Sequence, residues 1–318
     1  MKNYIKVLVL MMVALLAFTA CSTLDDKGVD TDNANGEIAI KKIGITQLVE
    51  HPSLDTIRSG AIQALVDAGY NDGENIEIEF LNAQGSMENT NTIANEFSNK
   101  EFDVVLGITT PSAQALFNKV KNTPIIYTAV TDPVSAGLVG ENISGVSDMT
   151  PVKKQFDLLI ELLPDTEIVG MIYNSSELNS EIQVEIAKEV SAEMGLELLV
   201  TSITNSNEVS LALDYILEEA DVLYVQKDNT LASAFPIVVK KADAKNIPII
   251  GAVTDFVDAG ALATDGPSEF EIGYESGKML VSILEGKDVA DIEAKLVDTT
   301  RRVFNLEVAK KYKVEIKE

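Results

Sequence analysis

Residues 124–139 read PIIYTAVTDPVSAGLV, and residues 248–262 read PIIGAVTDFVDAGAL. The two stretches share Pro-Ile-Ile, then Ala-Val-Thr-Asp, then Val-x-Ala-Gly. The likeness extends upstream, because residues 102–126 and 220–250 each hold an apolar run, a polar turn, an amphipathic stretch and a second apolar run. Each copy predicts a strand, a helix and a strand, and the repeat predicts two similarly built lobes. A cleft between such lobes is a usual place for a small ligand.

The length and the pattern of the chain indicate an α/β protein of two domains. A chain of 318 residues exceeds the size at which one hydrophobic core usually stops growing. Strands are predicted at 39–48, 76–81, 103–107 and 124–127, and again at 167–173, 197–202, 221–225 and 247–250. Amphipathic helices are predicted at 52–68, 88–98, from Pro111 onward, and at 179–194, 208–219, 230–244 and 270–284. This alternation predicts two Rossmann-like lobes with parallel sheets, joined by a hinge that the chain crosses several times.

The domain organisation follows from these elements and from the composition of the N-terminal region. We expect five parts: a signal peptide (1–20), an acidic tether (21–37), lobe 1 (38–150), lobe 2 (151–285) and a C-terminal segment that crosses the hinge (286–318). The tether is rich in Asp and lacks apolar periodicity, so it is interpreted as a solvated linker.

The first twenty residues have the pattern of an export signal. Lys2 and Lys6 lie at a polar start, residues 7–18 are apolar without charge, and Thr19 and Ala20 are small. This pattern is typical of a secretory signal peptide. Cys21, the single cysteine, lies where a lipoprotein signal peptide places the residue that carries the lipid; the alternative is an ordinary cleavage site beside an incidental cysteine. We therefore predict an extracytoplasmic protein that is held at the cell membrane by lipid on Cys21.

Composition disfavours several classes of function. The formal net charge of −25 disfavours nucleic acid as a partner, because phosphate contacts need clustered Lys and Arg. His51 is the only histidine, and a lone histidine in a turn is more often structural than functional. The sequence has no nucleophile elbow, no metal-ligand cluster and no nucleotide-binding glycine pattern. We expect no enzymatic activity, no catalytic residue, no cofactor and no metal.

The candidate binding residues lie in the turns that follow the predicted strands. In parallel α/β sheets, ligands sit outside the carboxyl ends of the strands, where helix N-termini point into a crevice. The hydroxyl pairs Thr109–Thr110 and Ser175–Ser176 suit a carboxylate, and Asp132 or Asp228 suits an ammonium group. The alternative for each of them is capping of the local helix or turn. A free amino acid carries both charges.

Aromatic residues near these turns are candidates to flank an apolar ligand side chain. They are Tyr127, Tyr173, Phe235 and Phe256. The alternative is that they belong to the hydrophobic core.

Several stretches resemble a known family. They are IGITQLVEHPSLDTIRSG (43–60), GITTPSAQAL (107–116), TAVTDPVSAGLV (128–139), GVSDM (145–149), IYNSSELNS (172–180) and DNT (228–230). They resemble the substrate-binding lipoproteins of ABC transporters, and more narrowly the members that bind tryptophan or phenylalanine. The resemblance implies a type I periplasmic-binding-protein fold and delivery of ligand to a membrane permease with a cytoplasmic ATPase. It also implies ligand contacts at Gln47, Thr109, Thr110, Asp132, Ser175, Ser176, Asn179, Asp228 and Asn229.

By analogy with amino-acid-binding relatives, the resemblance assigns the ligand carboxylate to the Thr109–Thr110 and Ser175–Ser176 turns and the ammonium group to Asp228. We therefore predict a solute-binding component of an ABC importer that closes around a small zwitterion, most simply an amino acid; an aromatic side chain is an extrapolation from the members that bind tryptophan or phenylalanine. Two alternatives stay open. One is a ligand-sensing receptor component of the same fold, and the other, disfavoured by the poor catalytic inventory, is a secreted hydrolase.

Overall fold

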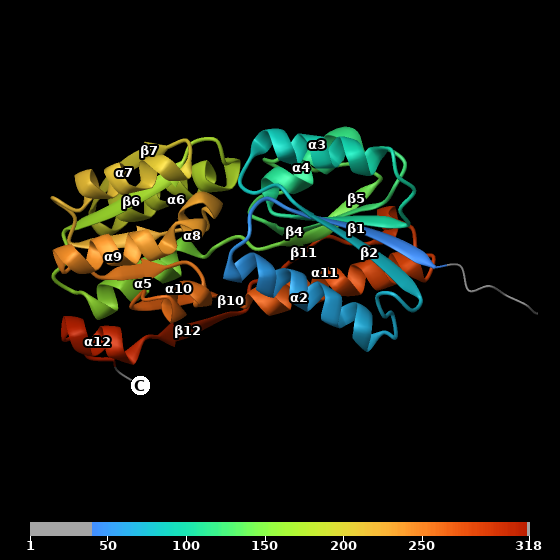
Figure 1. Ribbon diagram of the computed structural model, residues 1–318. Helices are drawn as coiled ribbons and strands as arrows, with labels where there is room; N and C mark the ends of the chain where they lie inside the picture. The colour runs from blue at the N-terminus through green and yellow to red at the C-terminus, as the bar shows by residue number, and fades with distance from the viewer. Residues whose placement is uncertain (1–39, 317–318) are drawn as a thin grey trace, which may run out of the picture. The chain divides into compact units, whose positions relative to one another are not determined.

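The computed structural model describes residues 40–316 (Figure 1). The predicted signal peptide, the tether and the lipid site at Cys21 lie outside the described residues. Within residues 40–316, no helix combines the length and hydropathy that a bilayer crossing requires.

The first lobe is built on a parallel sheet of six strands in the order β11-β5-β4-β3-β1-β2. Its strands are β1 (Lys41–Gln47), β2 (Ile76–Asn82), β3 (Val104–Ile108), β4 (Ile125–Val130), β5 (Ile143–Ser147) and β11 (Lys295–Leu296). One face is covered by α3 (Met87–Ser98) and α4 (Thr110–Lys119), and the other by α2 (Pro52–Asp67) and α11 (Glu269–Leu284) (Figure 1). The short 3₁₀ turn η2 (Val289–Asp291) joins α11 to β11.

The second lobe repeats this plan, with strand order β12-β10-β9-β8-β6-β7. Its strands are β6 (Ile168–Asn174), β7 (Glu197–Ile203), β8 (Val222–Val225), β9 (Ile249–Gly251), β10 (Ala263–Pro267) and β12 (Thr300–Phe304), of which β12 alone is antiparallel to its neighbour. One face carries α5 (Val152–Leu162), α6 (Leu178–Met194) and α12 (Leu306–Tyr312). The other carries the 3₁₀ turn η1 (Ser206–Glu208), α7 (Val209–Ile216), α8 (Asn229–Ser233), α9 (Phe235–Lys245) and α10 (Thr254–Asp258).

The internal repeat of the sequence corresponds to equivalent places in the two lobes. The strand of the first Pro-Ile-Ile copy, β4, lies between β3 and β5, and the strand of the second copy, β9, lies between β8 and β10. The prediction of two similar α/β lobes with mainly parallel sheets is therefore confirmed. Gly69 and Gly195 follow the ends of α2 and α6 with positive φ angles of 88° and 72°, which is the usual conformation of a glycine that ends a helix.

The predicted helix at 230–244 is two helices in the structure. Pro236 lies in the first turn of α9, and α8 ends just before it at Ser233. Proline has no N–H to donate to the preceding turn, so the continuous helix cannot form there.

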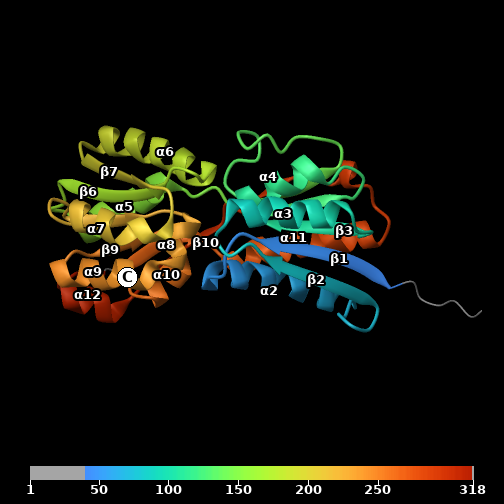
Figure 2. The same ribbon diagram turned by 45° about the horizontal axis from the view of Figure 1, so that its top comes forward.

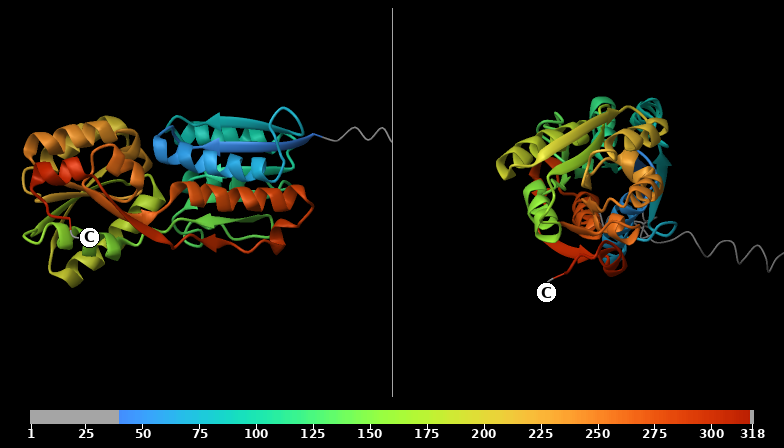
Figure 3. Two further views of the ribbon diagram at one scale, coloured as in Figure 1. Left: turned by 90° about the horizontal axis from the view of Figure 1, so that it is seen from below. Right: turned by 90° about the vertical axis from the view of Figure 1, so that its left-hand side faces the viewer.

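The chain crosses between the lobes three times, from β5 to α5, from β10 to α11 and from β11 to β12 (Figure 3). The expectation that lobe 2 runs to residue 285 is wrong for α11, which packs against α2 of lobe 1. Three glycines allow this close contact: a Cβ atom on Gly273 would lie 1.8 Å from the carbonyl oxygen of Ile57, and Gly60 and Gly277 are similarly tight. An amphipathic pattern predicts a helix but does not say which sheet the helix covers.

We predict that Gly273→Ala destabilises the protein, although alanine favours helix by about 1 kcal/mol over glycine. The added methyl group meets the backbone of α2, which cannot move aside as a flexible side chain would, so overpacking dominates. A net loss of about 2 kcal/mol in the free energy of unfolding is expected, measured by urea denaturation. Ser282→Ala, in the same helix, is the control and should change stability by less than about 0.5 kcal/mol. A Gly273→Ala protein as stable as the parent would contradict the tight α2–α11 contact.

Candidate functional site

The main pocket lies between the lobes, at the carboxyl ends of the strands, and about 470 Å³ of space there, including open solvent at its mouth, is not filled by protein atoms. Both copies of the repeat contribute to it, the first through Ala129 and Thr131 and the second through Val253 and Phe256. The lining residues are His51, Ser53, Leu54, Ile57, Thr109, Ala129, Thr131, Asp148, Asn179, Lys227, Asp228, Asn229, Ala232, Val253, Phe256 and Glu269.

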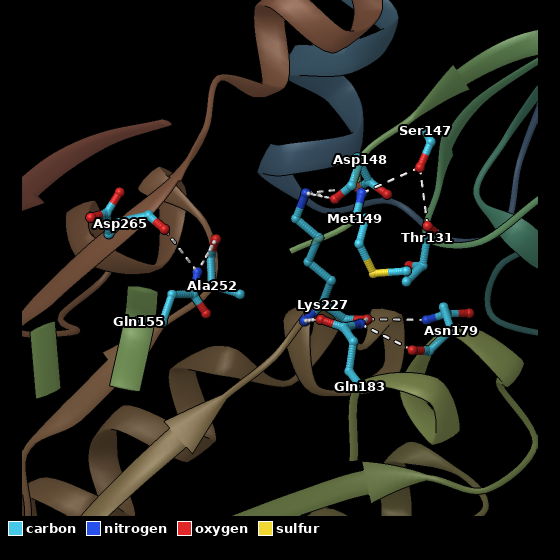
Figure 4. A network of polar contacts seen from close by, with 10 residues as sticks. All are labelled: Thr131, Ser147, Asp148, Met149, Gln155, Asn179, Gln183, Lys227, Ala252 and Asp265. Atoms are coloured by element: carbon cyan, nitrogen blue, oxygen red, sulfur yellow. Dashed lines mark hydrogen bonds and ion pairs between the residues drawn. The ribbon is translucent and has the colours of Figure 1, made fainter. Parts of the chain in front are cut away.

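The lobes touch across this pocket. Lys227, which follows β8 in lobe 2, donates to the Oδ2 atom of Asp148 in lobe 1 at 2.7 Å and to its backbone carbonyl at 3.1 Å (Figure 4). The side chains of the pair are only 11% and 5% exposed. Leu178 of lobe 2 also packs against the core of lobe 1, and α10 and α6 contact α2 and α4. The two lobes are therefore closed upon each other.

Several buried polar atoms of the pocket have no hydrogen-bond partner among residues 40–316. They are both ring nitrogens of His51, Oγ1 of Thr109, Oδ1 of Asp148, Oδ1 of Asn179 and Oε1 of Glu269. An unpaired buried polar atom costs about 1–3 kcal/mol. A cluster of them around one pocket therefore indicates a surface that is completed by a polar ligand.

Glu269 lines the pocket, has one carboxylate oxygen without a hydrogen-bond partner within residues 40–316, and has a strongly shifted pKa. It begins α11 at the second hinge crossing and is 4% exposed. Burial raises its pKa to about 7, although the nearby charge of Lys227 acts in the opposite direction. A carboxyl group with such a pKa ionises more readily when a cation approaches it.

Two helix N-termini meet the cleft, and they differ in how their N–H groups are satisfied. The start of α8 is occupied by the carboxylate of Glu177, which accepts hydrogen bonds from the backbone N–H groups of Asn229 and Thr230 and from both of their side chains. Glu177 is 1% exposed and also accepts from Asn174 and Asn179. The protein itself thus supplies the anion that this helix end favours.

The start of α4 is different. The hydroxyl groups of Thr109, Thr110 and Ser112 are buried there, and none has a partner in the described part of the chain. Thr109 has φ 85° and ψ 159°, a conformation that a residue with a side chain rarely adopts. Ala129, on the adjacent strand, also has a positive φ of 54°. Backbone strain of this kind concentrates at ligand sites.

An apolar wall completes the pocket. Leu54 and Ile57 of α2 face it from lobe 1, and Val253 and Phe256 from lobe 2. The ring of Phe256 stacks on that of Phe235, with ring centroids 4.2 Å apart and planes 9° apart. Of the four aromatic residues proposed from the sequence, Phe256 alone lines the pocket, and Tyr127 is 2% exposed among the core residues of lobe 1.

The structure brings four of the nine predicted binding residues to the main pocket: Thr109, Asn179, Asp228 and Asn229. Asp228, however, uses both carboxylate oxygens internally, accepting from the backbone N–H groups of Asn174 at 2.6 Å and Leu231 at 2.8 Å. Burial, followed by the neighbouring charge of Glu177, raises its pKa. Asp228 therefore braces the α8 turn, and each of its oxygens already accepts a hydrogen bond from the protein.

The other five predicted residues do not line the main pocket. Asp132 caps its own turn through the backbone N–H groups of Val134 and Ser135, both at 3.0 Å. The hydroxyl of Ser175 donates to a backbone carbonyl, and Ser176 lines a second, more polar cleft between the lobes. Thr110 is buried behind Thr109 at the start of α4.

Gln47 braces the turn between β1 and α2. It accepts from Arg58 at 2.7 Å and donates to the carbonyl of Val49 at 2.8 Å and to Asp55 at 3.1 Å. Its side chain therefore positions the segment that carries His51 without itself reaching the main pocket.

Sequence reasoning did not select three charged residues that line the pocket, namely Asp148, Lys227 and Glu269. Asp148 follows β5 and Glu269 follows β10, two strands that were not predicted. Their sequences, ISGVS and ATDGP, lack the apolar runs by which the other strands were found. Among residues 40–316, no group of His, Cys, Asp and Glu side chains is arranged to hold a metal ion.

Two similar α/β lobes that close over a pocket define the class of type I periplasmic binding proteins. The chain belongs to the family of ABC transporter substrate binding proteins, whose model matches residues 42–318. It is 40% identical to the tyrosine-binding protein of Clostridioides difficile (strain R20291) over 316 residues, which is 97% of this chain and 92% of that one. As a class, such proteins act outside the cytoplasm and bind their solutes rather than transform them.

Two solved structures bear on the conformation. An ABC domain from Streptococcus pneumonia in complex with L-Trp is 35% identical, covers 88% of this chain and 97% of its own, and superposes with a TM-score of 0.85. The ligand-free, open structure of a substrate binding protein with adhesive properties from Clostridium difficile is 44% identical, with coverage of 87% and 96%, but its TM-score is 0.66. The structure with the higher sequence identity has the lower TM-score, so identity does not explain the difference between the two TM-scores. The higher TM-score against the structure with bound L-Trp agrees with the closed arrangement of the lobes in this protein.

We predict that Glu177→Gln lowers the free energy of unfolding by about 1–3 kcal/mol. The amide nitrogen cannot accept the hydrogen bonds that the second carboxylate oxygen receives from Asn229, although relief of repulsion with Asp228 offsets part of the loss. Urea denaturation measures the effect. Glu193→Gln, at an exposed position of the same helix α6, is the matched control and should leave stability unchanged within about 0.5 kcal/mol. Equal stability of both variants would show that Glu177 does not hold the α8 turn.

Proposed function

We propose that this protein captures a free aromatic amino acid outside the cytoplasm and delivers it, chemically unchanged, to the permease of an ABC importer. The observation that carries the proposal is the combination of three surfaces in one pocket: unpaired carboxylate oxygens, the unpaired hydroxyl of Thr109 at the start of α4, and an apolar wall. A zwitterion with a large apolar side chain has the three complementary parts. The similarity to a tyrosine-binding protein and to a domain solved with L-Trp supports the same class of ligand.

We assign the ammonium group of the ligand to Asp148 and Glu269. Each has one buried oxygen without a partner that lines the pocket. Lys227 neutralises only one carboxylate, because both of its hydrogen bonds go to Asp148. A cation therefore finds a site with residual negative charge and low solvent exposure, where electrostatic attraction is strong. This assignment replaces Asp228, whose oxygens are engaged internally.

We assign the carboxylate of the ligand to the start of α4, where Thr109 contributes a hydroxyl at the pocket wall and the first helical turn contributes N–H groups. The competing helix end, at α8, already holds the carboxylate of Glu177. A second anion there would meet like charge. Of the two hydroxyl pairs that the sequence offered, the Thr109–Thr110 turn is therefore the better candidate.

Binding and closure are one equilibrium in this proposal. Asp148 and Thr109 belong to lobe 1 and Lys227 and Asn179 to lobe 2, so a ligand that touches both sets favours the closed form over the open one. In this proposal the protein binds and releases the ligand without changing it chemically. We further propose that lipid on Cys21 holds the protein at the cell membrane, which incorporation of labelled palmitate, compared with a Cys21→Ser variant, would test.

The direct experiment is a thermal-shift screen against the amino acids, common sugars and nucleosides. L-tyrosine, L-tryptophan or L-phenylalanine at a hundred times its dissociation constant should add about 2.7 kcal/mol of stability. The sugars and nucleosides serve as controls and should not shift the transition. A response to sugars or nucleosides alone would overturn the amino-acid assignment and leave the family membership in place.

We predict that affinity for the amino acid rises with pH between about 5.5 and 7. Below its pKa of about 7, Glu269 is protonated, and a ligand cation must displace that proton. Binding therefore weakens as pH falls, approaching tenfold per pH unit well below the pKa. Calorimetry in buffers of different ionisation enthalpy should detect the released proton.

Glu269→Gln should weaken binding at pH 8 and flatten this pH dependence. Asp132→Asn is the matched control, because Asp132 caps an exposed turn and should leave both affinity and its pH profile unchanged. Parent protein with the same affinity at pH 5.5 and pH 8 would refute the assignment of the ammonium group to Glu269.

A further inference from the structure

His51 lies at the entrance of α2 in lobe 1, just before Pro52, and its side chain lines the main pocket. Figure 2 shows this end of α2 directed toward lobe 2, beside α10, with which α2 is in contact. The residue is 8% exposed, and it is the only histidine of the chain. Neither ring nitrogen has a hydrogen-bond partner of normal geometry among the residues described.

Burial lowers the pKa of His51 to about 4. The imidazole is therefore neutral near pH 7, with one nitrogen that donates a hydrogen bond and one that accepts. It cannot act as a cation for the ligand carboxylate. What it offers the pocket is uncharged hydrogen bonding in an otherwise apolar region that includes Leu54 and Ile57 of the same helix.

Asn229 of lobe 2 raises the pKa of His51 against the larger effect of burial, and its amide nitrogen donates to Glu177. Neither imidazole nitrogen has a hydrogen-bond partner among residues 40–316. The unprotonated nitrogen of the neutral ring is therefore able to accept a hydrogen bond from a bound ligand.

His51 lies on the same helix as the apolar wall of the pocket. Leu54 and Ile57 follow it in α2 and line the same pocket. A ligand whose apolar side chain packs against Leu54 and Ile57 would therefore present that side chain to His51.

We propose that His51 is a specificity-determining residue that accepts a hydrogen bond from an O–H or N–H group on the ring of the bound amino acid. The inference rests on the proposed function. It narrows the ligand class to aromatic amino acids with a donor on the ring, a phenol or an indole, and disfavours phenylalanine. A site built to pair a ligand hydroxyl rejects the analogue that lacks it, because the buried protein atom is then left unpaired.

The single histidine permits a direct test in the full-length protein without mutation. With ¹⁵N-labelled histidine, the two imidazole nitrogens are observed by NMR while L-tyrosine, L-tryptophan or L-phenylalanine is added. L-tyrosine or L-tryptophan should shift the resonance of the unprotonated nitrogen upfield, as expected for a nitrogen that begins to accept a hydrogen bond. L-phenylalanine should leave it near its unliganded position. An identical response to a bound ligand with a ring donor and to bound phenylalanine would overturn the proposal.

Calorimetry on His51→Leu and His51→Gln separates recognition from structure. The parent should bind L-phenylalanine at least about tenfold more weakly than its preferred ring-donor ligand. His51→Leu should lose that preference, because its affinity for the ring-donor ligand falls while its affinity for phenylalanine stays within about threefold of the parent's. His51→Gln, which retains an acceptor, should recover part of it.

The outcomes distinguish this inference from the proposed function. Equal weakening of all three ligands by His51→Leu would make His51 structural and overturn the inference alone. Equal affinity of the parent for phenylalanine and its ring-donor analogues would do the same. Failure of the parent to bind any amino acid in the thermal-shift screen would overturn both.

Discussion

The structure depends on how the N–H groups of two helix ends at one cleft are satisfied. At α8 the protein supplies its own anion, because Glu177 is buried and accepts from the backbone of Asn229 and Thr230. That arrangement orients Asn229 and, with Asp228, fixes the turn after β8 that carries Lys227. At α4 the hydroxyls of Thr109, Thr110 and Ser112 have no hydrogen-bond partner among residues 40–316. Filling one helix end internally and leaving the other open gives the pocket a direction, with an anion expected at α4 and a cation near Asp148 and Glu269.

Most of the fold could be predicted from the sequence, because the strands that form the repeat are runs of apolar, β-branched residues. The two central strands that escaped prediction are exceptions with a physical cause. In β10, the residues Thr264, Asp265 and Gly266 are buried, and the carbonyl of Asp265 is paired with Gln155, a side chain distant in sequence (Figure 4). A strand that satisfies its polar groups through tertiary contacts carries no hydrophobic signal. Helix α11 was assigned to the wrong lobe for a related reason. Its glycines are compatible with a close helix contact, but the sequence does not say which helix is the partner.

The site was predicted less completely than the fold. The rule that ligands bind after strands selected Thr109, and the family resemblance added Asn179 and Asn229; all three line the pocket. The rule missed Asp148 and Glu269 because the strands before them were missed. The rule also could not show which carboxylates keep an oxygen without a hydrogen-bond partner. Asp132 and Asp228 occupy turns of the kind that the rule selects, yet their oxygens are bound by backbone N–H groups of their own neighbourhood. Which carboxylate stays free depends on side-chain packing across both lobes.

The path of the chain has a consequence for how the protein is made. The edge strand of lobe 1, β11, is separated from the rest of its sheet by all of β6–β10, and the edge strand of lobe 2, β12, follows only after it. The sheet of lobe 1 is complete only once residue 296 is available, and that of lobe 2 only once residue 304 is. The two lobes therefore finish folding almost together, late in synthesis, and no single cut in the gene would release one lobe whole.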